Sequence, residues 1–353
     1  MKADGRIEPG LLGMICPTEE GAEEAWDDVT GKRFSIKGVK KAREEEIFEF
    51  RKHGVYVKVP IAECYKVTGN APLKIRWIDI NKGDDDNEEN RSRLVAKVIK
   101  RDKRDDLFAA TPPLEALKIL LSLAVTEGVG YKRGERERGM KLEFIDVRRA
   151  YLQAQARRDV YVELPEEDQE EGMCGKLVKS MYGTRDAAQN WEEEYCSFME
   201  QLGFKRGIGS PCVFYHEDRD IRAVIHGDDF TLLAEEKHLD WFKVKIGEKF
   251  EVKYRGRLGP KDTDDKAIRV LNRVITWRED GLVYEPDQRH AEIIVKMLDN
   301  DVGNKTLTSP GRRVKPVEFK DDELDELPPR KATMFRALSA RANYLSQDRA
   351  DIR

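Results

Sequence analysis

Residues 223–233, AVIHGDDFTLL, are an apolar stretch broken in its middle by a glycine and two adjacent aspartates. Valine, isoleucine, phenylalanine, threonine and leucine favour strands, and Gly227 supplies the freedom of a tight turn, so the stretch predicts a β-hairpin. Buried carboxylates without partners are costly, so Asp228 and Asp229 need an explanation. Mg²⁺ binds one or two carboxylates together with substrate phosphates, so the turn is a candidate metal seat. A surface hairpin with an acidic turn is the alternative.

A second carboxylate stands in a similar setting. Asp146 lies near the end of the short apolar segment 141–147, which predicts a strand. Asp146 and Asp228 are far apart in the chain and meet only if the fold brings the two segments together. Two metal ions held by such carboxylates stabilise both the attacking and the leaving oxygen of a phosphoryl transfer. For Asp146 alone, an aspartate at a strand end without any function is the alternative.

The charge of the chain limits how it can bind nucleic acid. The 353 residues are enough for a large core and several subdomains. Charged residues make up 37% of the chain, but the net charge is only -4, so a nucleic-acid role depends on local patches. The strongest patch, residues 91–104, holds seven basic side chains and one acidic one. It predicts either contacts with phosphates or a solvated edge strand.

The sequence also limits the cellular compartments in which the protein is expected. It contains no run of about 18 apolar residues and no apolar core of a signal peptide at its N-terminus. We therefore expect an intracellular protein, in the cytoplasm or nucleus, that is neither secreted nor membrane-spanning. The five cysteines form no Cys-x-x-Cys pair, which predicts free thiols and no structural zinc site.

Hydrophobic spacing predicts mixed helices and strands. A solvent-exposed helix is expected over 39–53, and a helix from Leu114 has Thr111 as its N-cap. A further helix buries an aromatic stripe of Trp191, Tyr195, Phe198 and Leu202. The other expected helices are 237–250, 288–298 and 335–344, and the expected strands are 77–80, 91–99, 160–165, 212–216, 221–225, 270–277 and 281–284. Residues 303–330 are expected to form a linker.

Four segments resemble the motifs of reverse transcriptases from Ty1/copia retrotransposons. Segment 91–97 is similar to the fingers motif, 146–152 to the first catalytic motif, 180–191 to the nucleotide-site motif and 226–229 to the Tyr-Val-Asp-Asp box. The motifs follow in the family's order, and the resemblance runs from about residue 45 to the end. Three positions depart from the family: His226-Gly227 replaces Tyr-Val, Ala188 replaces a proline and Ala154 replaces a glycine.

The resemblance implies an α+β right-hand polymerase fold. Its parts would be a loosely ordered lead-in (1–40), fingers (41–140), palm with the first aspartate strand (141–164), a fingers and palm helix region (165–205), palm with the Asp-Asp hairpin (206–285), a thumb-like region and linker (286–330), and the start of a connection to a ribonuclease H domain (331–353). The chain stops before such a domain, so we expect a polymerase portion standing alone or a fragment of a polyprotein.

The resemblance also implies roles for individual residues. Asp146, Asp228 and Asp229 would be the catalytic carboxylates. Asp146 and Asp228 would bind two Mg²⁺ or Mn²⁺ ions together with the backbone carbonyl of Val147, and Asp229 would be a supporting carboxylate that is bound less directly. Tyr151 would be the steric gate that rejects a ribose 2′-hydroxyl. The other nucleotide-binding candidates are the backbone N–H groups of Arg149 and Ala150, the pair Tyr182 and Gly183, and the side chains of Arg91, Arg93 and Lys97, with Lys179 and Arg185 as weaker candidates. The partners would be an RNA or DNA template-primer and deoxynucleoside triphosphates.

Two alternatives to an active polymerase remain open. A catalytically inactive retroelement remnant, which binds nucleic acid or is inert, is favoured by His226-Gly227 and opposed by the three retained aspartates. A palm-type nucleotide cyclase is suggested by segment 227–230, GDDF, although no Gly-Gly precedes the acidic pair.

Overall fold

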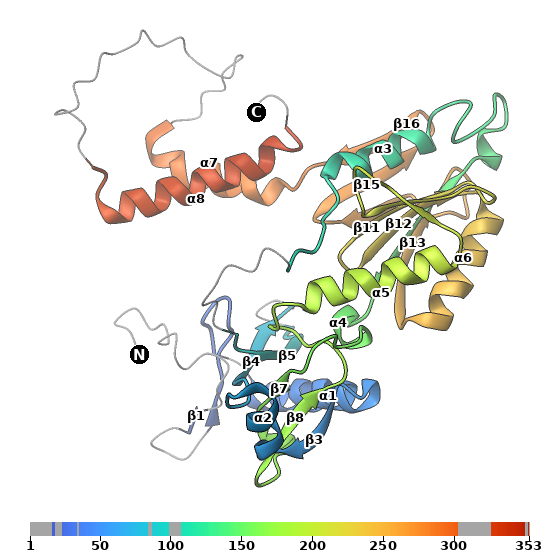
Figure 1. Cartoon of the computed structure of the whole chain (residues 1–353). Helices are drawn as coiled ribbons and strands as arrows, with labels where there is room; N and C mark the ends of the chain where they lie inside the picture. The colour runs from blue at the N-terminus through green and yellow to red at the C-terminus, as the bar shows by residue number, and fades with distance from the viewer. Residues whose placement is uncertain are drawn as a thin grey trace. The chain divides into compact units, whose positions relative to one another are not determined.

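The computed structural model describes residues 16–17, 23–33, 35–83, 87–98, 107–302, 326–349 and 352 (Figure 1). The chain divides into two compact units. Unit 1 comprises Met1–Pro112, Asp146–Phe230 and Phe242–Lys253, and unit 2 comprises Pro113–Ile145, Thr231–Trp241 and Tyr254–Arg353. Helices and antiparallel strands are mixed along the chain, which confirms the predicted α+β class. None of the described helices has both the length and the hydropathy needed to cross a bilayer.

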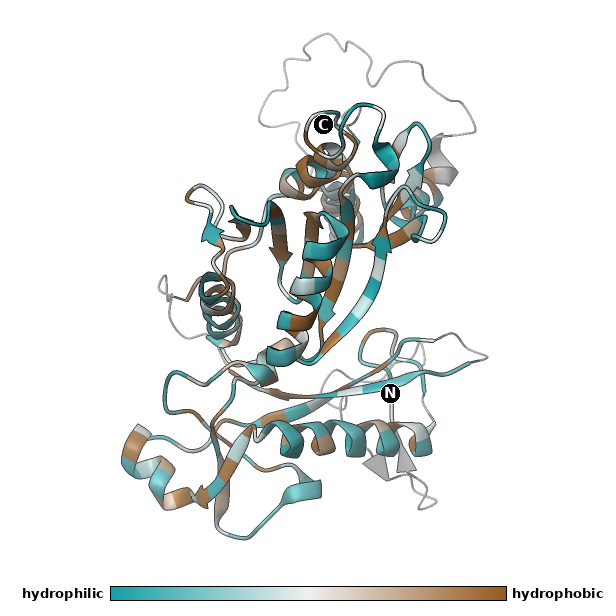
Figure 2. Cartoon of the chain, turned by 90° about the vertical axis from the view of Figure 1, so that its right-hand side faces the viewer, coloured by the Kyte–Doolittle hydropathy of each residue, from teal (hydrophilic) through white to brown (hydrophobic). Residues whose placement is uncertain are grey.

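A six-stranded sheet contains both predicted aspartate segments. Its strand order is β13-β6-β12-β11-β10-β9. The bounds are β6 (Lys141–Val147), β9 (Lys205–Arg206), β10 (Val213–His216), β11 (Ile221–His226), β12 (Asp229–Ala234) and β13 (Val252–Leu258). The predicted strand over 141–147 and the predicted hairpin at the paired aspartates are therefore confirmed. Figure 2 shows hydrophobic residues, in brown, on several of the strands. β6 and β12 are buried over most of their length, whereas β13, at the edge of the sheet, is exposed at Lys253, Tyr254 and Arg255.

The other strands of unit 1 form three smaller sheets, one of which pairs β1 (Cys16–Pro17) with β2 (Glu23–Glu24). β3 (Tyr56–Pro60), β8 (Met173–Leu177) and β7 (Tyr161–Val162) pair in that order, and β4 (Ile75–Asn81) pairs with β5 (Asn90–Ala96). The predicted 77–99 hairpin is confirmed, with Trp77 opposite Leu94, although its second strand ends at Ala96. Residues 99–104 of the basic patch lie outside the described residues.

The helices of unit 1 include α1 (Ile36–His53), α2 (Ile61–Thr68), α4 (Ala150–Gln153) and α5 (Ala187–Gln201). A core cluster of Ile47, Phe50, Trp77, Leu94, Leu152, Val160 and Met181, among others, joins α1, the β4–β5 hairpin and α4. On α5, Trp191, Tyr195 and Phe198 are buried as predicted, while Leu202 lies just after the last helical turn.

The prediction that α1 is a solvent-exposed helix is wrong. One face of the helix is buried, and it includes the charged residues Arg43 and Glu46 as well as Val39 and Phe50. The Arg43 guanidinium donates to both carboxylate oxygens of Asp79 on β4, at 2.6 and 3.3 Å. A paired charge can be buried where an isolated one cannot, and the partner lies too far along the chain to be read from helical spacing.

Unit 2 holds α3 (Leu114–Ala124), the three-stranded sheet of β14 (Ala267–Val270), β15 (Arg273–Arg278) and β16 (Gly281–Glu285), and the helices α7 (Gln288–Val302) and α8 (Pro329–Ser346). The predicted Thr111 N-cap is wrong: Pro113 occupies the N-cap position with an extended backbone, and no side chain caps α3. Leu117, Leu121 and Ala124 are buried as predicted. Residues 303–325 of the predicted linker lie outside the described residues.

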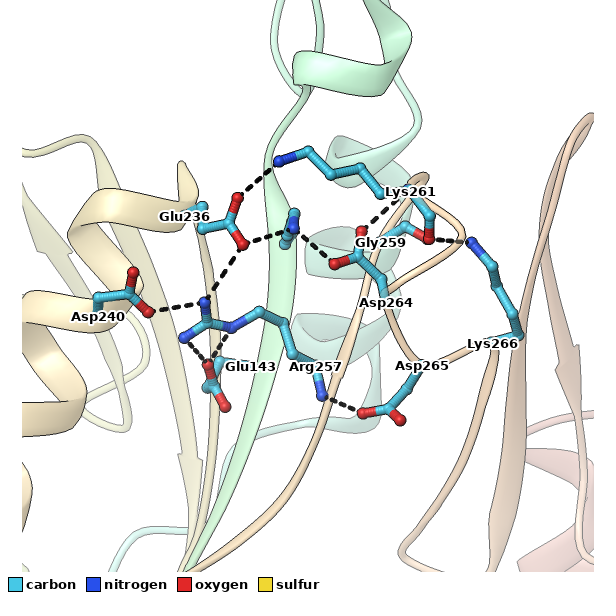
Figure 3. Close-up of polar contacts among 10 residues, drawn as sticks. Glu143, Glu236, Asp240, Arg257, Gly259, Lys261, Asp264, Asp265 and Lys266 are labelled. Carbon is cyan, nitrogen blue, oxygen red and sulfur yellow. Dashed lines mark hydrogen bonds and ion pairs between the residues drawn. The ribbon is translucent and has the colours of Figure 1, made fainter.

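An ionic network surrounds the start of β6 (Figure 3). Lys141, whose side chain is 2% exposed, pairs with Glu236 at 2.8 Å and with Asp264 at 2.5 Å. Glu236 opens α6 (Glu236–Lys249) and also pairs with Lys261 at 2.8 Å. Arg257 on β13 pairs with the buried carboxylate of Glu143, and with Asp240 at 2.8 Å. These pairs satisfy charges that would otherwise be costly on a buried strand.

Candidate active site

The end of β6 meets the turn between β11 and β12. The backbone N–H of Val147 donates to the carbonyl of Asp228 at 2.9 Å, so Asp146 and Asp228 lie on neighbouring chain segments despite their separation in sequence. Asp146 and Asp229 are half-buried and Asp228 is exposed. The structure thus brings the segments that carry the three predicted carboxylates to the same end of the sheet, with Asp228 open to solvent.

The turn itself is made by two residues. Gly227 has a φ of +65° and Asp228 is not among the described residues with positive φ, which is the pattern of a type II′ hairpin turn with glycine at its first central position. Trp191 on α5 donates its indole N–H to the carbonyl of Gly227 at 2.8 Å. Trp191 ends the segment 180–191 that resembles the nucleotide-site motif, but sequence analysis gave its side chain only a role in core packing. Helical spacing signals that a tryptophan is buried but not where its N–H points.

Two tyrosines lie beside the aspartates. Tyr151 on α4 and Tyr182 have their ring centroids 5.0 Å apart, with the rings tilted by 52°. Burial and then the negative charge of Asp228 raise the pKa of Tyr151. Burial also raises the pKa of Tyr182. Both hydroxyls therefore stay protonated at neutral pH, and the Tyr151 ring is near enough to Asp228 to sense its charge.

A cluster of cations adjoins the tyrosines. The Arg93 guanidinium stacks over the Tyr182 ring, 4.3 Å from its centroid. Partial burial and then the positive charge of Arg93 lower the pKa of Arg91, and Arg149 adds to this effect. Arg93 and Arg149 therefore lie close enough to Arg91 to disfavour its charged form, while Arg149 is itself paired with Glu46 at 3.1 Å.

Glu46 on α1 faces this cluster and was not found by sequence analysis. Its side chain accepts from Arg149 Nε at 3.1 Å. Burial raises the pKa of Glu46, and the charges of Arg149, Arg93 and Arg91 oppose that rise. Arg149 has a φ of +47°, a left-handed conformation that is strained for a residue with a side chain. Glu46 lies in a run of charged residues, so the sequence pattern did not indicate that its side chain would be buried next to the candidate site.

The other predicted residues are placed differently. Val147 and Ala150 are buried, and Gly183 is a turn residue next to the end of β5. Lys97 has different neighbours from Arg91 and Arg93. It lines a cavity of about 500 Å³ together with Cys64, Arg158 and Tyr161. Burial lowers the pKa of Lys179, whose ammonium donates to the Gln153 carbonyl at 3.3 Å.

The ligand chemistry of the aspartates fits a hard divalent cation, because the donors are carboxylate and carbonyl oxygens at one edge. A different group of side chains has its possible ligand atoms closest together. Among the described residues, the ligand atoms of Glu49, His53 and Glu251 all lie within 4.8 Å of one another. Cations already occupy that group, since Lys52 pairs with Glu251 at 2.5 Å and Arg149 with Glu49 at 3.5 Å. We therefore read it as an ion-pair network.

Comparisons with known proteins place the chain in a family. The model of the family described as "Reverse transcriptase (RNA-dependent DNA polymerase)" matches residues 64–260, which is more than half of the chain. The Pol polyprotein of transposon TNT 1-94 from Nicotiana tabacum is 27% identical over 247 residues, covering 65% of this chain and 17% of that protein. The Ty1-DR4 Gag-Pol polyprotein of Saccharomyces cerevisiae is 27% identical over 193 residues, covering 52% and 11%.

The chain spans less than a fifth of the length of these curated relatives. Among solved structures, the foamy viral protease-reverse transcriptase dRH in complex with double-stranded DNA shares 11% identity at a TM-score of 0.38, over 86% of this chain and 48% of that one. The family assignment follows from the sequence matches.

Proposed function

The chain belongs to the reverse transcriptases of the Ty1/copia class, and from this premise we propose that it extends a primer 3′-hydroxyl along an RNA or DNA template, using deoxynucleoside triphosphates. One observation carries the proposal. The hydrogen bond from Val147 to the Asp228 carbonyl joins the two strand ends that bear the acidic residues. Such an acidic edge is what nucleotidyl transfer requires.

The family generally uses divalent metal ions, and Mg²⁺ or Mn²⁺ is the ion we propose here. Asp146, Asp228 and Asp229 would hold it with their carboxylates and Val147 with its backbone carbonyl. When bound, such ions lower the pKa of an attacking hydroxyl and neutralise charge on the reacting phosphate. The exposed Asp228 is open to solvent, and the half-buried Asp146 and Asp229 are supported by the strands that carry them.

The tyrosines and arginines would bind the incoming nucleotide. We assign Tyr151 the role of steric gate, because its ring contacts that of Tyr182 and the charge of Asp228 acts on its hydroxyl. Tyr182 and Gly183 would line the base and sugar. Arg91 and Arg93 would contact the phosphates, with the backbone N–H groups of Arg149 and Ala150 beside them. Lys97 is the weakest of these assignments, because it lines a different cavity.

We propose the same subdomain bounds that the family resemblance implies. The β4–β5 hairpin would belong to fingers over 41–140, and the strands of the acidic edge to palm segments 141–164 and 206–285. Residues 165–205 would be the helix region between them, 286–330 the thumb-like region and linker, and 331–353 the start of a connection to a ribonuclease H domain. The family match leaves the cyclase alternative without support.

An inactive remnant is the remaining alternative, and primer extension decides between the two. The purified chain is incubated with a primed RNA template, deoxynucleoside triphosphates and either Mg²⁺ or Mn²⁺. We expect Asp228→Asn to reduce incorporation by more than about 100-fold, because even residues that only support metal ligands cost 10- to 100-fold. The control is Asp218→Asn, which removes an exposed aspartate from the preceding hairpin turn and should leave the rate unchanged. Equal, trace incorporation by wild type and Asp228→Asn would establish the remnant instead.

A further inference from the structure

The turn that presents Asp228 has little side-chain packing of its own. Gly227 is exposed, and a Cβ added to it would meet no atom within 4 Å. Asp228 is exposed as well. A glycine is also the residue that restrains the backbone least, so the position of this turn depends on its hydrogen bonds.

Two backbone acceptors of the turn are bound from outside the hairpin. The Asp228 carbonyl accepts from the Val147 N–H at 2.9 Å, and the Gly227 carbonyl accepts from Trp191 Nε1 at 2.8 Å. The first bond joins the turn to the end of the neighbouring strand β6. The second is a side-chain bond from α5, and a buried indole N–H can only donate.

The Trp191 side chain is itself held rigidly. It is 2% exposed and makes edge contacts with Phe250, at a centroid distance of 5.1 Å, and with Tyr195, at 5.7 Å. The indole therefore has little freedom to follow the turn if the turn moves. A fixed donor and a glycine acceptor together define where the first residue of the turn lies.

We propose that Trp191 is a positioning residue for Asp228: its N–H fixes the Gly227 carbonyl and thereby sets the place of the carboxylate one residue later. The role rests on the proposed function, in which Asp228 binds a divalent ion. Removing the N–H leaves the Gly227 carbonyl without this partner, so the turn samples more conformations and its carboxylate is less often in place. Trp191 touches neither ion nor substrate in this role.

The test compares Trp191→Phe with Tyr195→Phe. Both substitutions remove one hydrogen-bond donor from an α5 side chain that is 2% exposed, but within the described part of the chain the Tyr195 hydroxyl contacts only the Cys212 sulfur, at 3.9 Å. The first measurement is amide hydrogen exchange of residues 225–231 in metal-free protein. We expect Trp191→Phe to speed exchange in this segment about tenfold, the change that corresponds to losing one hydrogen bond. Tyr195→Phe should leave it unchanged.

The second measurement is Mn²⁺ affinity by electron paramagnetic resonance, and the third is steady-state primer extension. We expect Trp191→Phe to weaken Mn²⁺ binding and to lower kcat, by about 10-fold or more, with KM for the deoxynucleotide nearly unchanged. Asp228→Asn, which keeps the indole, should weaken Mn²⁺ binding without speeding exchange in the turn.

Two results would overturn the positioning role. One is unchanged exchange in 225–231 in Trp191→Phe. The other is faster exchange spread evenly over α5 and the turn, which marks general loosening. A wild-type chain that binds Mn²⁺ but extends no primer would overturn the proposed function alone, because exchange and Mn²⁺ affinity would still report whether Trp191 places Asp228.

Discussion

Left-handed backbone recurs at the residues around the acidic edge. Arg149, Gly183 and Gly227 have φ values of +47°, +86° and +65°. Gly183 is the most constrained of them by its surroundings, because an added Cβ would lie 2.1 Å from the Ala96 carbonyl oxygen. The neighbouring Tyr182 carbonyl accepts from the Ala96 N–H at 2.8 Å, so the turn cannot retreat without breaking that bond.

Gly183→Ala is therefore expected to destabilise the protein by about 2–4 kcal/mol, combining backbone strain with a clash against main-chain atoms. Urea unfolding measures the change. Gly69→Ala is the matched control: Gly69 has a φ of +67° but nothing within 4 Å of its added Cβ, so the expected cost is only about 1–2 kcal/mol. Equal costs for the two variants would show that contact with β5 is unimportant.

At the scale of elements, β6 is fixed by charge as well as by its ladder. Lys141 joins the start of this strand to Glu236 on α6 and to Asp264 beyond β13, and Lys261 binds the same Glu236 (Figure 3). Hydrogen bonds from Lys141 and Lys261 lower the pKa of Glu236 to about 2. The usual glutamate pKa is near 4.5, so the folded state binds the proton less tightly than the unfolded state.

A lowered carboxyl pKa contributes stability that is fully present above the unfolded pKa of 4.5 and is lost as the pH falls towards 2. We expect Glu236→Gln to lower the Tm by about 2–4 °C at pH 7, a modest effect because the Glu236 side chain is 44% exposed. The difference from wild type should shrink as the pH falls below 4.5 in thermal unfolding followed by circular dichroism. A difference that is constant from pH 7 to pH 3 would contradict this origin. Glu127→Gln, at an exposed site in unit 2, is the control.

The sequence predicted elements with a strong local pattern. The β11–β12 hairpin and β6 follow from runs of strand-forming residues and a turn glycine, and α5 follows from its aromatic stripe. What it missed depends on partners distant in the chain. The charges of Arg43 and Glu46 led to the prediction that α1 is exposed. Their partners, Asp79 and Arg149, are distant in the chain, so helical periodicity does not reveal the pairing. The direction of the Trp191 N–H is lost for the same reason.

At the scale of the whole molecule, the net charge of -4 opposes binding to nucleic acid. Local clusters such as Arg91, Arg93 and Arg149 must outweigh that field at short range. The motif order and the acidic residues could be predicted from sequence because they are contiguous signals. The arginine cluster could not, because it combines β5 with the segment between β6 and α4. Four of the cysteines, Cys64, Cys174, Cys196 and Cys212, are free and buried, which confirms the free-thiol prediction for these four.

Binding to a primer-template is therefore expected to depend steeply on salt. With about four phosphate contacts, affinity should fall about 100-fold between 50 and 200 mM salt. Fluorescence anisotropy with a labelled duplex measures this, and a duplex with uncharged methylphosphonate linkages provides the comparison. Affinity that is the same at both salt concentrations would mean that phosphate contacts do not drive binding.

The two-residue connection between β11 and β12 also has a genetic consequence. One extra codon inserted there would make a three-residue loop or shift β12 by one position, and either change would disturb the hydrogen bonds that Gly227 and Asp228 accept from Trp191 and Val147. Among related retrotransposon sequences, a change of length at this turn is therefore expected to abolish DNA synthesis. Reading frames that keep Gly227-Asp228 unbroken are the ones in which selection for DNA synthesis is worth testing.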